Sequence, residues 1–354
     1  MKKLILKLML YITTFAVVGI APAFSPLAVF YFRHWEAVRA HSRSLFPGPF
    51  YPLQKSFMIE EGDLGHGTPY AVLKNVYWET DRYGYRKADS SQHPEIVIIG
   101  DSNIVGSSLT QDSTFSEVLQ KKVGQSTYPY APGNINSFLQ DTRFINNPPK
   151  IVILSCIERS ILIDTDQIQN KLISNLNLKS KITNEVKTII SSNNRFVTHT
   201  AITLDRIRKQ ELKNYIQAKI EPKTMGVRYH DMLFYEGPNA VTTAEDFKIQ
   251  KTIKIISEYN KYFKKKHIYF MYMPVPNKET IYYDLLPSKP KFTILKQIQQ
   301  GLKLSGVPTI DVLSAYESHK KNGKNPYQID DTHWNAMGVK IAADIAANMI
   351  QKPN

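Results

Sequence analysis

Cysteine is almost absent from this chain: Cys156 is the single thiol among 354 residues, so no disulfide can form within it. A zinc site built from four cysteines is excluded for the same reason. The sequence also contains no zinc-finger, helix-turn-helix or RNA-recognition pattern, and we expect no nucleic-acid partner. Acidic residues are comparatively few, 31 against 45 lysines and arginines, which leaves a formal net charge of +14. That charge suits an anionic partner such as lipid head groups or an acidic polymer.

Charge is also missing from Leu8–Phe32, a segment that follows three early lysines. As a helix, its 25 residues would span roughly 37 Å, more than the hydrocarbon core of about 30 Å. We therefore expect residues 1–33 to hold a membrane anchor that crosses at 8–32. A cleaved signal peptide is the alternative, with Leu8–Ile20 as its apolar core and a cleavage site just beyond it. With the N-terminus inside, either segment would carry the rest of the chain across a membrane.

Two further segments differ in composition from the rest of the chain. Residues 34–90 are rich in Pro, Gly and Tyr without a sustained period, and we interpret them as an N-terminal arm that packs on the main domain. Residues 91–354 form that domain, with an insertion over about 162–247. Within the insertion, Lys171–Lys223 carries 11 basic and 4 acidic residues, half of the chain's excess positive charge. We expect a solvated helical insertion, with a surface for anionic lipid or acidic polymer as the alternative.

Short apolar runs alternate with helical patterns in the main domain. The run Glu95–Gly100 is β-branched and ends in glycine, as is typical of a buried parallel strand. It is followed by a helix over Ser113–Val123, a strand over Thr127–Ala131, a helix over Ile135–Ile145 and a strand over Lys150–Cys156. This order predicts a doubly wound parallel sheet. Strands at His267–Met273 and Val307–Val312 and a last helix at Asn335–Ile350 are expected further on.

Two short motifs carry the chemistry. Gly100-Asp101-Ser102 directly follows the first strand, where a serine at the start of a helix faces a cleft and where backbone N–H groups can hold an oxyanion. Asp330-Asp331-Thr332-His333 lies near the C-terminus and precedes the last helix. A serine nucleophile needs a base, and the base needs a carboxylate that fixes its tautomer. Either aspartate can supply that carboxylate to His333, whereas a helix cap and a capping loop are the structural alternatives for the two motifs.

The two motifs together, the second read as Asp331-Thr332-His333-Trp334-Asn335, resemble the SGNH hydrolase superfamily. The closer resemblance is to its bacterial polysaccharide O-acetyltransferase branch, the family of the alginate O-acetyltransferases. Three more stretches are similar to that branch: Trp78 to Arg86, Ile157-Glu158-Arg159, and Pro274 to Tyr282. The resemblance implies an α/β fold, a flavodoxin-like three-layer α/β/α sandwich with a parallel sheet and the active site at the carboxyl ends of its strands.

The resemblance also implies roles for single residues. Ser102 would be the nucleophile, His333 the general base and Asp331 its orienting partner, with Asp330 as the alternative carboxylate. Gly133 stands where the superfamily places a glycine whose N–H binds the oxyanion.

The third block of the superfamily departs from its usual form. Its usual asparagine donor is missing, because this chain has Cys156-Ile157-Glu158-Arg159 there. Asn134 or Arg159 would take its place, and a buried structural role for Glu158 and Arg159 is the alternative. Cys156 is expected to be a small core residue.

The implied function is a membrane-anchored O-acetyltransferase that modifies an exported polysaccharide through an acyl-serine intermediate. The acetyl donor would be supplied by a membrane-bound acyltransferase, and no metal or cofactor is expected. The expected location is the bacterial inner membrane, with the catalytic domain on its periplasmic side. Two alternatives stay open: an acetylesterase or deacetylase of glycan or lipid, and a non-catalytic polysaccharide-binding or scaffold protein.

Overall fold

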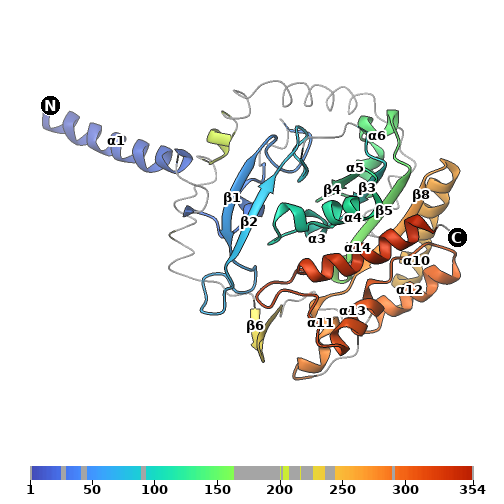
Figure 1. The fold of residues 1–354 in the computed structure, drawn as a ribbon. Coiled ribbons are helices and arrows are strands. Elements are labelled where there is room, and N and C mark those ends of the chain that lie inside the picture. The colour runs from blue at the N-terminus through green and yellow to red at the C-terminus, as the bar shows by residue number, and fades with distance from the viewer. Residues whose placement is uncertain are drawn as a thin grey trace.

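The computed structural model describes residues 2–24, 29–40, 46–88, 93–162, 200, 202–206, 216, 226–235, 244–288 and 292–352. The chain begins with helix α1 (Lys2–Phe24), which extends away from the rest of the molecule in Figure 1. Within the described ranges, no helix combines the length and the apolar character that a membrane crossing requires. The transmembrane helix expected over residues 8–32 therefore has no support from the structure.

The centre of the molecule is a four-stranded parallel sheet, as the sequence predicts. Its strand order is β4 (Thr127–Tyr130), β3 (Ile96–Ile99), β5 (Ile151–Ile157) and β8 (Tyr269–Val275). In the register, Ile98 pairs with Pro129 on one side and with Ile153 on the other. All four residues of β3 are buried, because helices cover both faces of a parallel sheet and leave no solvated side.

Helices pack on this sheet in two groups. The main ones are α4 (Phe115–Val123), α5 (Ile135–Leu139), α10 (Asp246–Lys265), α12 (Ile294–Leu304) and α14 (Ala336–Gln351). Helices α4 and α14 run side by side, whereas α10 packs on α12 and β8 (Figure 1). Phe263 of α10 also contacts Phe138 of α5. The chain passes from β3 out to β4 and back to β5, so right-handed crossovers place α4 on one face and α5 on the other.

Two expected elements differ in detail. The helix predicted over Ile135–Ile145 is split into α5 and α6 (Thr142–Asn146), because the Asp141 carboxylate caps α6 by accepting a hydrogen bond from the Arg143 N–H at 3.0 Å. The strand predicted over Val307–Val312 is a single bridge between Thr309 and Tyr272. Helix α13 (Val312–Lys321) begins directly after it, which leaves no length for a longer ladder.

The arm contains a hairpin that the sequence pattern did not reveal. Strands β1 (Lys55–Glu60) and β2 (Lys74–Glu79) pair antiparallel, and each is only six residues long. The loop between them, residues 61–73, reaches the C-terminal loop: the N–H groups of Leu64 and Gly65 donate to the Asp330 carbonyl at 3.2 and 3.0 Å. Two regions far apart in sequence therefore meet at one place.

The insertion lies mostly outside the described residues. This holds for almost all of the basic stretch Lys171–Lys223, so the structure adds nothing about its role. The described part includes the antiparallel pair β6 (Gly226–Tyr229) and β7 (Met232–Tyr235). The Leu233 N–H donates to the Ile329 carbonyl at 2.8 Å, which places this pair beside the C-terminal loop.

Candidate active site

Ser102 lies at the carboxyl edge of the sheet, between the ends of two strands. Strand β3 ends at Ile99, and the short helix α3 (Ser102–Val105) begins after Gly100 and Asp101. One oxygen of the Asp101 carboxylate accepts from the Asn103 N–H and the other from the Ile157 N–H, both at 2.8 Å. From β3 the chain first adds β4 on one side of the sheet and then β5 on the other. Open α/β sheets form their ligand crevice between two strands at such a point, here β3 and β5. Asp101 thus holds the serine turn at that crevice.

Arg86 supports the helix that carries Ser102. Its buried guanidinium donates to the carbonyls of Val105, Gly106 and Leu109 at 3.0, 2.5 and 2.5 Å. The same group stacks on the Trp78 ring at 3.8 Å. These carbonyls lie at and just beyond the C-terminal end of α3, where carbonyl groups lack donors within the helix, and Arg86 supplies N–H groups to them. Trp78 and Arg86 therefore stabilise the helix that begins at Ser102 by fixing the backbone that follows it.

His333 joins the two motifs. Its Nε2 lies 2.7 Å from Ser102 Oγ, and its Nδ1 lies 2.5 Å from Asp331 Oδ1. An ionised carboxylate only accepts, so Nδ1 carries the proton and Nε2 is left to accept the hydrogen bond from the serine hydroxyl. The His333 N–H donates to the same carboxylate oxygen at 3.0 Å, which fixes the ring relative to its own backbone. The structure therefore brings the three predicted residues into one hydrogen-bonded chain.

Asp331 and His333 each change the pKa of the other. Burial by itself raises the pKa of Asp331, but the charge and hydrogen bond of His333 hold that pKa well below its ordinary value. Burial likewise lowers the pKa of His333, and the Asp331 carboxylate more than reverses this and raises it. Asp331 is therefore ionised, and it stabilises the imidazolium that forms when His333 takes a proton.

Asp330 points elsewhere. Its carboxylate pairs with Lys74 Nζ at 2.7 Å and accepts from the Val72 and Gly62 N–H groups at 2.8 and 2.9 Å. All of these partners belong to the arm, and none belongs to the histidine. Of the two carboxylates that the sequence left open, the structure places Asp331 on His333 and Asp330 on the arm.

The three candidates for oxyanion binding do not come together. The Gly133 N–H donates to the Gly100 carbonyl at 2.9 Å, so it is already used. Asn134 caps helix α5, where its side chain accepts from the Ser137 N–H. Gly133 and Asn134 line a cavity of about 630 Å³ that extends under Gly100 and Asp101.

Arg159 lies on the other side, toward the histidine loop, with Nη2 at 3.5 Å from Thr332 Oγ1. The Ser102 N–H lies at the first residue of helix α3, where the helix supplies no acceptor, and the described part of the chain offers it none either; it can therefore bind a developing oxyanion.

Glu158 and Lys278 hold the loop that carries the histidine. The buried Glu158 carboxylate accepts from the Asn277 N–H at 2.9 Å and from the Thr280 hydroxyl at 2.5 Å, which ties the end of β5 to helix α11 (Lys278–Ile281). Lys278 Nζ in turn donates to the carbonyls of Gln328 at 2.6 Å and Asp331 at 3.2 Å. These contacts support the buried structural role that was the alternative considered for Glu158.

Glu158 also makes stability depend on pH. Burial raises its pKa to about 7, although the hydrogen bonds from Thr280 and Asn277 lower it. Because the folded protein holds this proton more tightly than the unfolded chain, stability is lost as the pH rises from about 4.5 to 7. We expect Glu158→Gln, which stays neutral, to gain about 2 kcal/mol over the wild type between pH 5 and pH 8. Urea unfolding at both pH values measures this.

The control for this prediction is Glu245→Gln, which neutralises an exposed glutamate at the start of α10. It should change stability equally at the two pH values. A Glu158→Gln variant whose advantage did not grow with pH would contradict the raised pKa.

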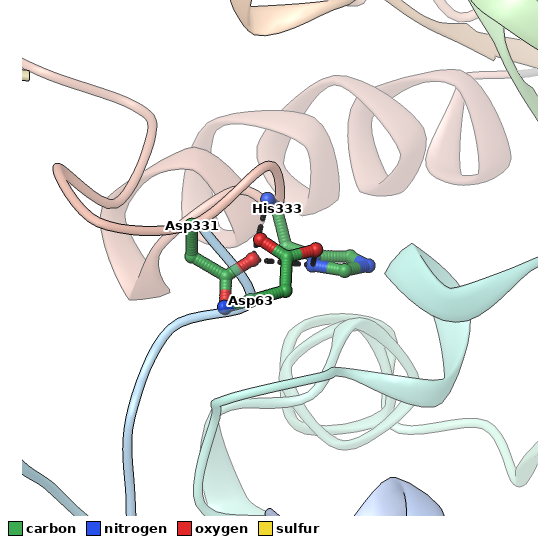
Figure 2. A group of neighbouring side chains, drawn as sticks. All are labelled: Asp63, Asp331 and His333. Carbon is green, nitrogen blue, oxygen red and sulfur yellow. Dashed lines mark hydrogen bonds and ion pairs between the residues drawn. The ribbon is translucent and has the colours of Figure 1, made fainter. Parts of the chain in front are cut away.

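Asp63 is a site residue that the sequence reasoning missed. Figure 2 shows its carboxylate and that of Asp331 converging on the same side of the His333 ring. Asp63 Oδ2 lies 3.6 Å from His333 Nδ1, and the N–H and hydroxyl of Thr332 donate to Asp63 at 2.8 and 2.7 Å. No pattern in residues 34–90 marked this aspartate, because it comes from a loop that only the fold brings to the histidine.

Asp63, Asp331 and His333 form a cluster whose candidate ligand atoms lie within 4.8 Å of one another, close enough to hold a cation. Their donors and acceptors are already paired, however. Nδ1 of His333 shares its proton with Asp331, and Asp63 accepts two hydrogen bonds from Thr332. We therefore interpret the cluster as a hydrogen-bonded acid–base system.

Comparison with known families agrees with this geometry. A family model described as an SGNH hydrolase-like domain of the acetyltransferase AlgX matches residues 230–354. The matched part includes Asp331 and His333 and stops short of Ser102. The resemblance to the SGNH hydrolases is thus confirmed over residues 230–354, which are similar to an SGNH hydrolase-like domain of the acetyltransferase or esterase type. No curated protein and no solved structure matched the chain.

Proposed function

We propose that this protein is a serine-dependent O-acetyltransferase in which Ser102 is the nucleophile, His333 the general base and Asp331 the carboxylate that orients it. The observation that carries the proposal is the chain of two short contacts, 2.7 Å from Ser102 to His333 and 2.5 Å from His333 to Asp331. Both distances are within the range that proton transfer requires. The match to an acetyltransferase-type domain supports acyl groups as the cargo.

The first half-reaction forms an acyl-enzyme. His333 Nε2 takes the proton of Ser102 while Oγ attacks the carbonyl carbon of an acetyl ester. The negative charge that develops on the carbonyl oxygen faces the Ser102 N–H at the start of α3. When this intermediate collapses, the bond to the leaving group breaks and the leaving oxygen receives the proton from His333. Acetyl is then held on Ser102.

The second half-reaction decides between transfer and hydrolysis. An acceptor hydroxyl gives its proton to His333 and attacks the acetyl carbonyl. The bond from the acetyl carbon to Ser102 Oγ then breaks, Oγ takes the proton back from His333, and the acetyl ester is left on the acceptor. Water in the same position would release acetate. We propose a polysaccharide hydroxyl as the acceptor, and the net charge of +14 supports an acidic polymer.

We place this reaction outside the cytoplasmic membrane of a bacterium, at the periplasmic side of the inner membrane. The early lysines followed by the uncharged segment Leu8–Phe32, typical of an export signal, support this location. A polysaccharide exported to that compartment would be the acceptor, and a membrane-bound acyltransferase would supply acetyl there. The location, the acceptor and the donor are parts of the proposal that can fail separately from the chemistry of Ser102.

The test is to trap the intermediate. The full chain is mixed with p-nitrophenyl acetate, quenched in acid and digested, and the peptide containing Ser102 is examined by mass spectrometry for an added acetyl group. The reaction is repeated with acidic and neutral oligosaccharides. Acetyl on Ser102 together with acetylated sugar supports the transferase, whereas acetyl on Ser102 with acetate as the sole product indicates an esterase. Turnover without acetyl on Ser102 would overturn the proposal.

A further inference from the structure

The Asp63 side chain brings the arm into contact with the loop that carries the histidine. The Asp63 N–H donates to Asp331 Oδ2 at 3.2 Å, and the Asp63 carboxylate accepts both hydrogen bonds from Thr332. Thr332 stands between the carboxylate Asp331 and the base His333 in the sequence. Asp63 therefore contacts both Asp331 and Thr332, the two residues that precede His333. It does so from a loop about 270 residues upstream.

We propose that Asp63 is a positioning residue of the acyl-transfer site, a second carboxylate that keeps His333 aligned and stabilises its protonated form. The proposal rests on the function proposed above, because it assigns to Asp63 a role in the proton transfer by His333. Asp63 does not touch the serine, so it acts through the histidine and through Thr332.

The electrostatics of the site support this role. The charged groups that act on His333 are Asp331, Asp63 and Arg33: the two carboxylates raise the pKa of His333 against the burial that lowers it, and Arg33 lowers it. Asp63 Oδ2 is 3.6 Å from His333 Nδ1 and 3.7 Å from Arg33 Nη1. An opposite charge at that distance favours the protonated imidazole, the form that exists in both tetrahedral intermediates.

The hydrogen bonds from Thr332 favour the ionised form of Asp63. Burial and the charge of Asp331 raise the pKa of Asp63 above its ordinary value, and the opposing effects of His333, Arg33 and Thr332 offset only part of that rise. Both bonds from Thr332 are donated to Asp63, one from N–H and one from O–H, so its two oxygens act as acceptors. Because the Thr332 N–H is fixed at the same time, Asp63 constrains the backbone next to His333 as well as its charge.

The arm is anchored where it delivers this residue. Leu64 and Gly65 bond to the Asp330 carbonyl, and the Asp330 carboxylate holds Gly62 and Lys74 on either side of the loop. A Cβ on Gly62 would come within 2.2 Å of the Asp330 carbonyl oxygen, so the loop approaches the C-terminal loop closely. Through this contact the arm holds Asp63 next to His333, so the arm contributes a residue to proton transfer as well as covering the domain.

The experiment compares Asp63→Asn with Glu61→Gln in the full chain. Asparagine keeps the shape and an acceptor for Thr332 but removes the charge. Glu61 is on the same loop and its carboxylate accepts from the Gly67 N–H, so its substitution is a matched loss of charge outside the site. Two readouts are used: the pKa of His333 from NMR titration of its imidazole, and the pH dependence of kcat/KM with p-nitrophenyl acetate.

We expect Asp63→Asn to lower the His333 pKa by about one unit, so that the acidic limb of kcat/KM moves down by about one pH unit. One pKa unit corresponds to a tenfold change in an equilibrium, so kcat should fall about tenfold as the imidazolium is stabilised less. Glu61→Gln should change neither quantity.

An unchanged His333 pKa in Asp63→Asn would overturn the inference, and so would a loss of kcat that came without the pH shift, since that pattern belongs to a purely structural role. The NMR titration needs no turnover, so it tests Asp63 by itself. If Ser102→Ala released acyl groups as fast as the wild type, the proposed function would fail while the titration still decided the charge effect of Asp63.

Discussion

Replacing Ser102 by alanine is expected to lower acyl release from p-nitrophenyl acetate by about 10⁴-fold or more. The substitution removes the hydroxyl that lies 2.7 Å from His333 Nε2, so no acyl-enzyme can form. His333→Ala should cost about the same, because the serine then has no base. The double variant should be no slower than either single one, since the residues act as a unit. Initial rates measured over the same range of enzyme concentration give all three values.

The matched controls are Ser318→Ala and His319→Ala, which remove the same side-chain types from helix α13 outside the site. Both controls should keep wild-type rates. Thermal unfolding of each variant separates loss of chemistry from loss of folding. A Ser102→Ala protein that folded and kept a tenth or more of the activity would show that another nucleophile does the work.

The second large effect is expected at Asp331. Asp331→Asn replaces an oxygen that accepts from His333 Nδ1 at 2.5 Å by an amide that can donate to it. The ring then takes the opposite tautomer, with its proton on Nε2, and cannot accept the proton of Ser102. A change of this kind costs about 10⁴-fold in kcat where it has been studied in serine triads. Steady-state kinetics with the acetyl ester measures it.

Asp330→Asn is the matched substitution one residue away, and its expected outcome is different. Asp330 is buried and paired with Lys74, so losing its charge leaves that ammonium without its partner. Breaking a buried ion pair costs about 3 kcal/mol or more, which urea unfolding would detect. Activity per folded molecule should fall by less than about tenfold, since the carboxylate does not reach His333. The reverse order, with Asp330→Asn the less active variant, would make Asp330 the triad carboxylate.

Much of the fold could be predicted from local patterns. The strand predicted at Glu95–Gly100 appears as β3 (Ile96–Ile99), because a short run of β-branched apolar residues that ends in glycine suits a parallel strand covered on both faces. The last helix was expected at Asn335–Ile350 and spans Ala336–Gln351, with the Asn335 side chain capping its first N–H groups. These elements depend on neighbouring residues alone, so the pattern was sufficient.

The errors arose where distant contacts decide. Residues 307–312 have the composition of a strand, but the chain turns into α13 after one bridge to Tyr272. Gly133 occupies the expected place for an oxyanion donor, yet its N–H is given to the Gly100 carbonyl. In both cases the local residues are compatible with either conformation or role. The contact with a distant residue, Tyr272 in the first case and Gly100 in the second, decides which one is found.

The sequence by itself determined the two reacting motifs, the parallel α/β sheet and the resemblance to the SGNH hydrolases, because each is written in short runs of adjacent residues. It also limited the orienting carboxylate to Asp330 or Asp331. The family resemblance favoured Asp331, and the tertiary structure turns Asp331 toward His333 and Asp330 toward Lys74. Only the tertiary structure brought Asp63 to the same histidine. Which of two adjacent carboxylates faces a base, and which loop reaches it, depends on packing between segments hundreds of residues apart, and no local pattern encodes that packing.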